Sequence, residues 1–186
     1  MVRAVRTFLA LTVAVLLAAC AGYLAARQGA LRREADARAA ARLETQAALL
    51  RSAAALLSAR PATSASEFSR FVAHLPLREA GLSSLGFLRS FHRGETAQVE
   101  GELRALGAPG RVFPDLGREE RSAVLLLEPP RPGQVGLDLF TDPAYREALE
   151  RSRATHAPAR AQVRTGSFLC LPVAGGAGWT FGELDY

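Results

Sequence analysis

The stretch that decides the fold is AVLLLEPPRPGQVGLDLFTDPAYREAL, residues 123–149. It opens with the unbroken apolar run 123–127, which has the length of a strand and is typical of a strand buried on both faces. Pro and Gly crowd residues 128–133 and predict a turn that ends this strand. Residues 135–140 are then expected to return as a second strand. The first part of the stretch therefore predicts two strands of one sheet.

The second part of the stretch predicts a helix over residues 143–155. Asp142 is a natural N-cap, and Pro143 occupies the first helical position, where its missing N–H costs nothing. Glu147 and Arg151 are four residues apart, so their side chains can pair across the helix surface. The chain therefore passes from sheet to helix within this stretch.

The sequence on either side predicts further elements of the same domain. Ser64 and Glu67 have the spacing of a capping box at the start of a helix. The expected elements are helices over 64–75 and 95–106 and strands over 82–91, 161–164 and 168–173, with 178–182 a candidate for the next strand. Helices that alternate with paired strands indicate an α+β domain on an antiparallel sheet with flanking helices.

An apolar segment near the N-terminus, Thr7–Ala26, contains twenty residues without a charge. At about 1.5 Å per residue it matches the hydrocarbon thickness of a bilayer, which predicts a transmembrane helix. Arg3 and Arg6 precede it and favour a cytoplasmic location for residues 1–6.

A second interpretation of this segment rests on Leu17-Ala18-Ala19-Cys20, which resembles a bacterial lipobox. In that case a signal peptide is removed and Cys20 carries a lipid. The segment stays apolar for six residues beyond Cys20, which favours the uncleaved spanning helix. Either interpretation places the rest of the chain outside the cytoplasmic membrane.

A long stalk helix is expected over residues 27–60, which are rich in Ala, Arg, Leu, Glu and Gln. Glu34 and Arg38 are one turn apart and can pair. A heptad-like seam runs along the helix at Leu43, Ala47, Leu50, Ala54 and Leu57. This seam fits two arrangements, a helix packed on its own domain and a homodimer formed through the stalk.

The ordered set of motifs resembles the CHASE domain, a family of extracytoplasmic sensory domains. The resemblance covers about Arg27 to Val173. The matching pieces are, in chain order, the helix at Glu67-Phe68, the strand from Gly81 to Phe91, Leu125-Leu126-Leu127-Glu128-Pro129, Gly136-Leu137-Asp138-Leu139, Asp142-Pro143, Arg146, Ala148-Leu149, Arg153 and Leu171-Pro172-Val173. Two departures are His156, where the family has Gly after the helix, and Ala174, where an aromatic residue is common.

The resemblance implies a PAS-like fold behind a long N-terminal helix, with 61–186 as the sensory domain. It implies the input module of a bacterial membrane receptor, anchored in the inner membrane with its sensory domain in the periplasm. A small-molecule ligand would act there on an output histidine kinase, nucleotide cyclase, diguanylate cyclase or phosphodiesterase. We expect the chain to be the N-terminal part of such a receptor, with a domain truncated at its C-terminal end. The alternative is an envelope adaptor or binding protein held by the lipid on Cys20.

The candidate ligand-binding residues are Glu128, Asp138 and Arg146. Glu128 and Asp138 each follow an apolar strand and can face a pocket. Both also have a structural interpretation, since Glu128 can hold the Pro-rich turn and Asp138 can pair with Arg146 or Arg153 inside the fold. The sequence leaves both interpretations open.

Composition argues against several other functions. All 23 basic residues are Arg and are scattered among acidic ones, so the net charge of +5 does not form the basic patch of a nucleic-acid-binding protein. The histidines lie apart from one another and from the cysteines, which predicts no metal site. Cys170 is expected to be a buried apolar residue. No nucleophile, phosphate-loop or cofactor motif occurs, so we expect no catalysis and no cofactor in this chain.

Overall fold

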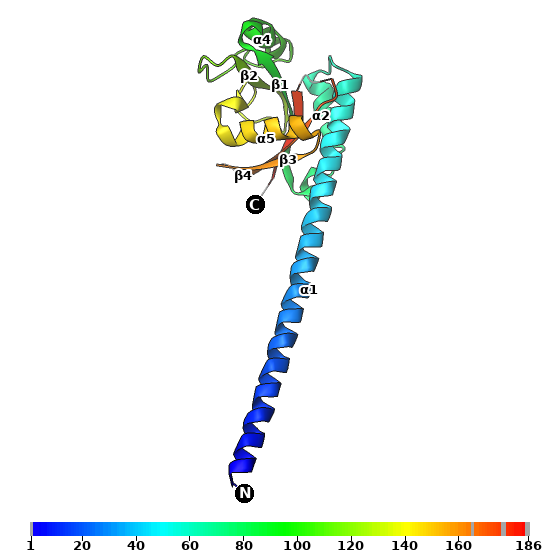
Figure 1. The fold of residues 1–186 in the computed structure, drawn as a ribbon. Helices are drawn as coiled ribbons and strands as arrows, with labels where there is room; N and C mark the ends of the chain where they lie inside the picture. Colours follow the sequence, from blue (N-terminus) through cyan, green and yellow to red (C-terminus); the bar gives the residue numbers. More distant parts are fainter. Residues whose placement is uncertain (1, 165, 176–177, 185–186) are drawn as a thin grey trace. The chain divides into compact units, whose positions relative to one another are not determined.

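The computed structural model describes residues 2–164, 166–175 and 178–184, and within 2–19 it describes the backbone alone. The chain forms two compact units, Met1–Leu43 and Glu44–Tyr186. Helix α1 (Val2–Ala59) makes up the first unit and supplies the first residues of the second (Figure 1).

The first unit is a single helical segment whose described side chains are almost all exposed. Arg38 pairs with Glu34 at 2.5 Å, which confirms the predicted contact across one turn. Within the part of the chain that the structure describes, no helix is both long and apolar enough to span a membrane. The span expected over 7–26 falls mainly on residues 7–19, whose side chains lie outside the described ones.

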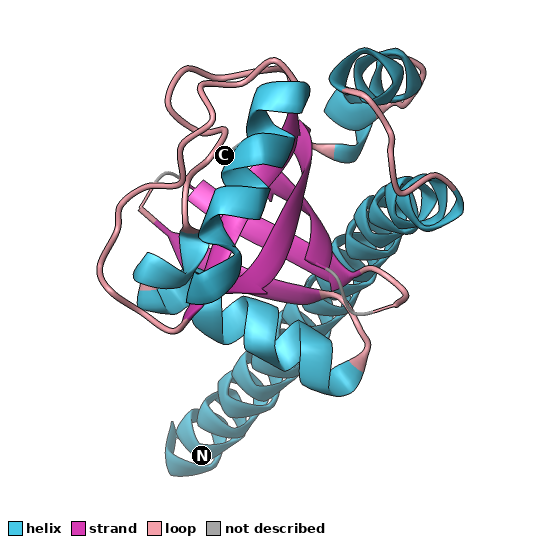
Figure 2. Cartoon of the chain, turned by 90° about the horizontal axis from the view of Figure 1, so that it is seen from above, coloured by secondary structure: helices cyan, strands magenta, loops and turns pink. Residues whose placement is uncertain are grey.

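The second unit is built on one antiparallel sheet of five strands, which Figure 2 shows at the centre of the unit with helices around it. The strands are β1 (Leu82–His92), β2 (Glu120–Glu128), β3 (Ala159–Val163), β4 (Gly166–Pro172) and β5 (Gly178–Leu184). They lie in the order β2-β1-β5-β4-β3. The α+β class and the antiparallel sheet with flanking helices are therefore confirmed.

The candidate strand over 178–182 occupies a central place in this sheet. It forms β5, which pairs with β1 on one side and with β4 on the other. Gly178 fits only without a side chain, because a Cβ there would collide with the carbonyl oxygen of Leu88. β1 and β5, far apart in the sequence, are thus neighbours, and β5 is the middle strand of an open sheet with β2 and β3 at its edges.

One face of the sheet is covered by α1, α2 (Ala65–Ala73) and α4 (Thr96–Ala105). Ala47, Leu50 and Leu57 of the heptad-like seam are buried in this layer, so this part of the seam packs on its own domain. Gln46 is buried beside them and donates to the carbonyl of Ala80 at 2.8 Å. The C-terminal part of α1 is therefore a core element of the second unit.

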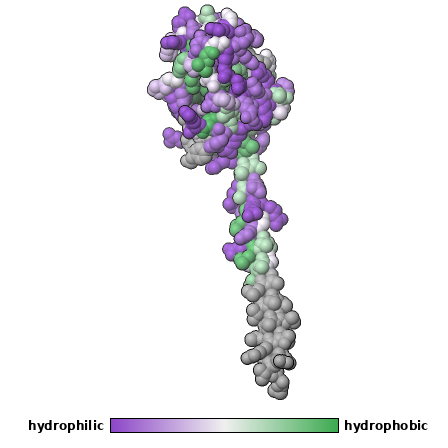
Figure 3. All heavy atoms as spheres, turned by 60° about the vertical axis from the view of Figure 1, so that its left-hand side comes forward, coloured by the Kyte–Doolittle hydropathy of each residue, from purple (hydrophilic) through white to green (hydrophobic). Residues whose placement is uncertain are grey.

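The other face is covered by α5 (Pro143–Thr155) and the short 3-10 helix η2 (Leu139–Thr141). Trp179 of β5 is 1 % exposed, meets the Phe140 ring edge-on at 5.9 Å and donates its indole N–H to Leu149 at 3.1 Å. Tyr145 packs edge-on against Phe168 at 4.7 Å. Aromatic side chains therefore fill this face. On the side of the unit that Figure 3 shows, hydrophilic residues predominate, with some hydrophobic ones among them.

The predicted helix caps are confirmed. Ser64 and Glu67 form a reciprocal capping box at the start of α2, and these bonds from Ser64 lower the pKa of the Glu67 carboxyl. Asp142 accepts from the N–H of Ala144 at 2.9 Å at the start of α5. His156 ends α5 in the left-handed conformation, with φ 51°. The position where the family has Gly thus keeps the glycine-like backbone.

The prediction of a strand over 135–140 is wrong. Gly133 and Gly136 have φ 73° and 87°, values that bend the chain away from the extended conformation. The segment makes one isolated parallel bridge, between Leu137 and Phe113, and Gly136 and Leu137 each share one backbone hydrogen bond with Val124 of β2. Asp138 then caps η2. Val135 and Leu137 are apolar because this loop packs on the core. The loop does not form a strand of the sheet.

Cys170 lies in the middle of β4 and is completely buried, as predicted. Burial raises the pKa of its thiol to about 12. The thiol therefore stays protonated at neutral pH and acts as part of the apolar core.

Candidate functional site

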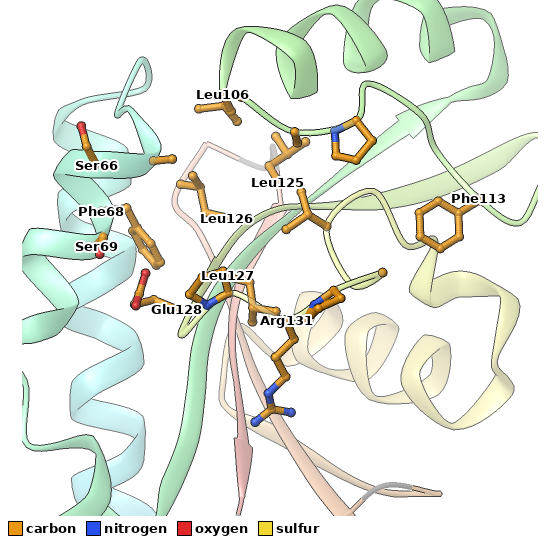
Figure 4. A pocket seen from close by; sticks show the side chains of 18 residues that line it. Ser66, Phe68, Ser69, Leu106, Phe113, Leu125, Leu126, Leu127, Glu128 and Arg131 are labelled. Atoms are coloured by element: carbon orange, nitrogen blue, oxygen red, sulfur yellow. The ribbon is translucent and has the colours of Figure 1, made fainter.

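A cavity of 710 Å³ opens at the edge of the sheet where β2 ends. Figure 4 shows it between α2, the segment that follows α4, and the Pro-rich turn after β2. It is lined by Ala65, Ser66, Phe68, Ser69, Leu106, Gly107, Ala108, Pro109, Phe113, Leu125, Leu126, Leu127, Glu128, Pro130, Arg131, Pro132, Gly133 and Val135. The lining is mostly apolar with a few polar groups, which is the usual composition of a small-molecule site.

Local structure explains why the cavity has apolar walls. β2 is an edge strand. Its three leucines 125–127 directly precede Glu128, the last residue of the strand. The rings of Pro130 and Pro132 prevent the chain from continuing as a strand. Phe68 enters from α2 with its side chain 1 % exposed. The cavity therefore lies at the end of β2, with α2 and the Pro-rich turn as two of its walls.

Glu128 brings a negative charge to this apolar site. Its side chain is half-buried at the end of β2, and Figure 4 shows its carboxylate beside the ring of Phe68 and close to Ser69. Among the residues that the structure describes, no hydrogen bond or ion pair reaches this carboxylate. Glu128 thus places a carboxylate on the wall of the cavity.

Arg131 is the cation of the cavity lining, and its charge is already paired. Its guanidinium donates to the carboxylate of Glu183 on β5, which also accepts from the hydroxyl of Ser84 at 3.3 Å. In Figure 4 the guanidinium points away from the leucines. Arg131 therefore ties the Pro-rich turn to the central strand of the sheet.

The same central strand contacts α1. The hydroxyl of Thr180 on β5 has one proton to donate; its nearer acceptor is the carbonyl oxygen of Leu50 at 3.1 Å, and that of Leu171 lies at 3.4 Å. All three residues are buried. β5 is thus in contact with the cavity through Glu183 and with α1 through Thr180.

Asp138 does not line the cavity. Its carboxylate is 1 % exposed and accepts from the N–H and hydroxyl of Ser122, at 2.9 and 3.0 Å, and from the N–H of Phe140 at 3.1 Å. Its ionic partner is Arg121, at 3.4 Å. Asp138 is therefore paired inside the fold, which is one of the two interpretations that the sequence left open, but the partner is Arg121 and not Arg146 or Arg153, because the loop before η2 turns Asp138 toward β2 and not toward α5.

Arg146 lies neither at the cavity nor beside Asp138. It lines a separate surface hollow of 330 Å³ together with Arg118, Glu119 and Glu150. Arg153 is not at the cavity either, since both its terminal nitrogens contact Glu120 at 3.0 Å. The structure therefore does not bring the three candidate residues together, and of the three only Glu128 lines the cavity.

Sequence reasoning missed most of the cavity lining. Phe68 falls in the helix predicted over 64–75, but nothing in the sequence indicates that this helix borders an open space. Arg131 could have been singled out as the only charged residue inside the Pro-rich turn 129–133. Ser69 and Leu106 carry no signal of their own, since they come together only in the folded domain.

The model of the CHASE domain family matches residues 61–165, more than half of the chain. The chain belongs to the CHASE domain family. CHASE domains are extracytoplasmic sensory modules of signalling receptors. The matched segment includes β1, β2 and α5 and all the residues that line the cavity. A search of curated proteins gave no match to this chain.

Proposed function

We propose that this CHASE domain senses a small molecule that binds in the cavity at the end of β2. The observation that carries the proposal is the cavity itself, which combines an apolar lining with a carboxylate, that of Glu128, to which none of the described residues is bonded; both lie within the matched segment. Its volume of 710 Å³ lies inside the range of about 300–1,000 Å³ that is usual for small-molecule sites.

Signal transfer would run through β5 to α1. Arg131 joins the cavity wall to β5 through Glu183, and Thr180 joins β5 to the carbonyl of Leu50 on α1. A ligand that moves the Pro-rich turn would shift this strand and thereby bias the position of the helix. By linkage, any state of α1 that the ligand favours must in turn favour the ligand.

The receptor setting belongs to the same proposal. The uncharged segment 7–26 would anchor the chain in the bacterial inner membrane with the PAS-like domain in the periplasm, and the order of strands in the five-stranded sheet supports the PAS-like assignment. The output, a histidine kinase or diguanylate cyclase, would lie in a part of the receptor outside this chain. The alternative is a lipoprotein attached through Cys20 that acts as an adaptor or binding protein.

A homodimer through the stalk would use residues that precede the second unit. Leu24 and Leu31 are seven residues apart on α1 and are 54 % and 58 % exposed, and Leu43 is also exposed. Heptad spacing of exposed leucines is typical of a helix that pairs with a second copy.

Substitution of Ser69 by Trp tests the location of the site. Ser69 is half-buried on the cavity wall, so an indole there would fill the space. Three probes of the same shape are titrated calorimetrically into the full chain in mild detergent: tryptamine, tryptophol and indole-3-propionate. We expect at least one to bind and the S69W variant to weaken that binding by about tenfold or more, since the ligand loses its apolar contacts.

The matched control is S58W, which places the same indole on an exposed position of α1 and should leave binding unchanged. Circular dichroism shows whether both variants stay folded. Binding that S69W leaves intact, or the absence of binding by all three probes, would contradict the proposed function.

A further inference from the structure

We propose that the cavity is selective for cations, and that its ligand is an organic ammonium whose nitrogen pairs with Glu128 and whose apolar body lies on the leucines of β2. This inference rests on the proposed function, because it names the chemical class that the same cavity would bind. It follows from the charges of the lining residues, taken one by one.

Two formal charges line the cavity, those of Glu128 and Arg131. The Arg131 guanidinium is bound by Glu183, so it contributes little net charge to the space between α2 and the turn. Glu128 has no such partner within the described part of the chain. A second hollow that Glu128 also borders contains Arg78 and Glu79, whose charges offset each other. The cavity therefore has a net negative character centred on Glu128.

The surroundings of Glu128 strengthen its preference for a cation. The carboxylate is half-buried between apolar side chains, where charges interact more strongly than they do in water. Charge-assisted hydrogen bonds are also stronger than neutral ones. The same carboxylate would repel an anionic ligand in this space. The site therefore favours a cation and disfavours an anion.

The neighbouring groups fit an ammonium as a donor. An ammonium has three N–H donors and no acceptor, whereas carboxylate and hydroxyl oxygens accept. Ser69 and Ser66 both line the cavity and supply hydroxyl acceptors, Ser69 on the side of Glu128 and Ser66 one turn further along α2 in Figure 4. Leu125, Leu126 and Leu127 supply the apolar surface for the rest of the ligand. One end of the ligand would thus be cationic and the other apolar.

The test compares tryptamine, tryptophol and indole-3-propionate, which share one ring and differ in the charge of the side chain. At pH 7 in low salt we expect the full chain to bind tryptamine about tenfold or more tighter than tryptophol, the factor that a charged hydrogen bond contributes. Indole-3-propionate should bind most weakly. Added salt should reduce the difference between tryptamine and tryptophol.

Two variants and a control locate the effect. E128Q should lower the affinity for tryptamine to that for tryptophol and leave tryptophol unchanged. R131Q leaves the carboxylate of Glu183 without its partner, so tryptamine should bind at least as tightly as before. The control is E119Q, which removes the same charge from an exposed residue outside the cavity and should have no effect on any probe.

The outcomes separate this inference from the proposed function. If indole-3-propionate binds most tightly and loses affinity in R131Q, the cavity is a site for anions and the inference is overturned, while the sensing role stands. Equal affinities for all three probes would also overturn it. If no probe binds, both the inference and the proposed function fail. If E128Q does not fold, the relative affinities of the three probes for the unaltered chain still test whether the cavity prefers a cation.

Discussion

Replacing Asp138 by Ala is expected to lower the free energy of unfolding by about 3–5 kcal/mol. Asp138 and Arg121 are 1 % and 2 % exposed and form a buried ion pair at 3.4 Å. Without the carboxylate, Arg121 keeps one other charged neighbour, Asp115 at 3.6 Å, which is itself exposed. The N–H and the hydroxyl of Ser122 also lose their acceptor, while the N–H of Phe140 keeps only the hydroxyl oxygen of Ser122 at 3.2 Å. The measurement is urea unfolding of the full chain in mild detergent, followed by circular dichroism.

Two other aspartates give matched controls for this substitution. Asp142 only caps α5, so D142A should cost about 1 kcal/mol. Asp36 is exposed on α1, and D36A should change the free energy of unfolding by less than about 0.5 kcal/mol. If D138A is as stable as D142A but no longer binds the probe that the unaltered chain binds, Asp138 is a ligand contact and the structural role is wrong.

Replacing Trp179 by Ala is the second large effect that we expect, a loss of about 3–5 kcal/mol. The ring is buried on β5 between Phe140 and α5, with the guanidinium of Arg153 5.2 Å from its centre. Truncation would leave a cavity in the middle of the face that α5 covers. The same urea titration measures the loss.

Trp179 to Phe is the matched control, because it keeps an aromatic ring and removes the hydrogen bond from the indole N–H to Leu149. The expected cost is about 1–3 kcal/mol, smaller than that of the Ala variant, since the Leu149 carbonyl loses a partner but most of the packing stays. If W179A costs no more than the Phe variant, the C-terminal strand is not the central, buried element described here.

Much of the fold follows from local patterns in the sequence. The run 123–127 is apolar enough to be a buried strand in any α+β domain, and Asp142-Pro143 begins a helix by local chemistry alone. The capping box at Ser64 is equally local. These elements were predicted correctly because each depends on neighbouring residues and not on the rest of the fold.

The errors concern residues whose roles depend on distant contacts. The alternating residues 135–140 predicted a strand, but Gly136 takes a left-handed conformation and packs against the carbonyl of Arg111 so closely that a Cβ would collide with it. The ionic partner of Asp138 is Arg121 on β2 and not an arginine of the helix that follows it. The order of strands, with β5 in the centre, also depends on pairings far apart in the chain.

The candidate site was predictable only in part. Glu128 was a reasonable candidate, because a charged residue that ends an apolar strand is held at an exposed edge. The partners that decide its role come from α2 and from the turn after β2, and the pairing of Arg131 with Glu183 joins residues 52 apart. Such contacts have no signature in one sequence.

A ligand in the cavity is expected to change the conformation or stability of α1. Hydrogen exchange with mass spectrometry tests this expectation most directly. The full chain is compared with and without the tightest-binding of the three indole probes. We predict slower exchange in two places: around the cavity, in α2 and the turn 128–133, and in residues 46–57 of α1, which contact β5 through Thr180. Slower exchange around the cavity alone, with α1 unchanged, would contradict the claim that this domain transmits the signal through its helix.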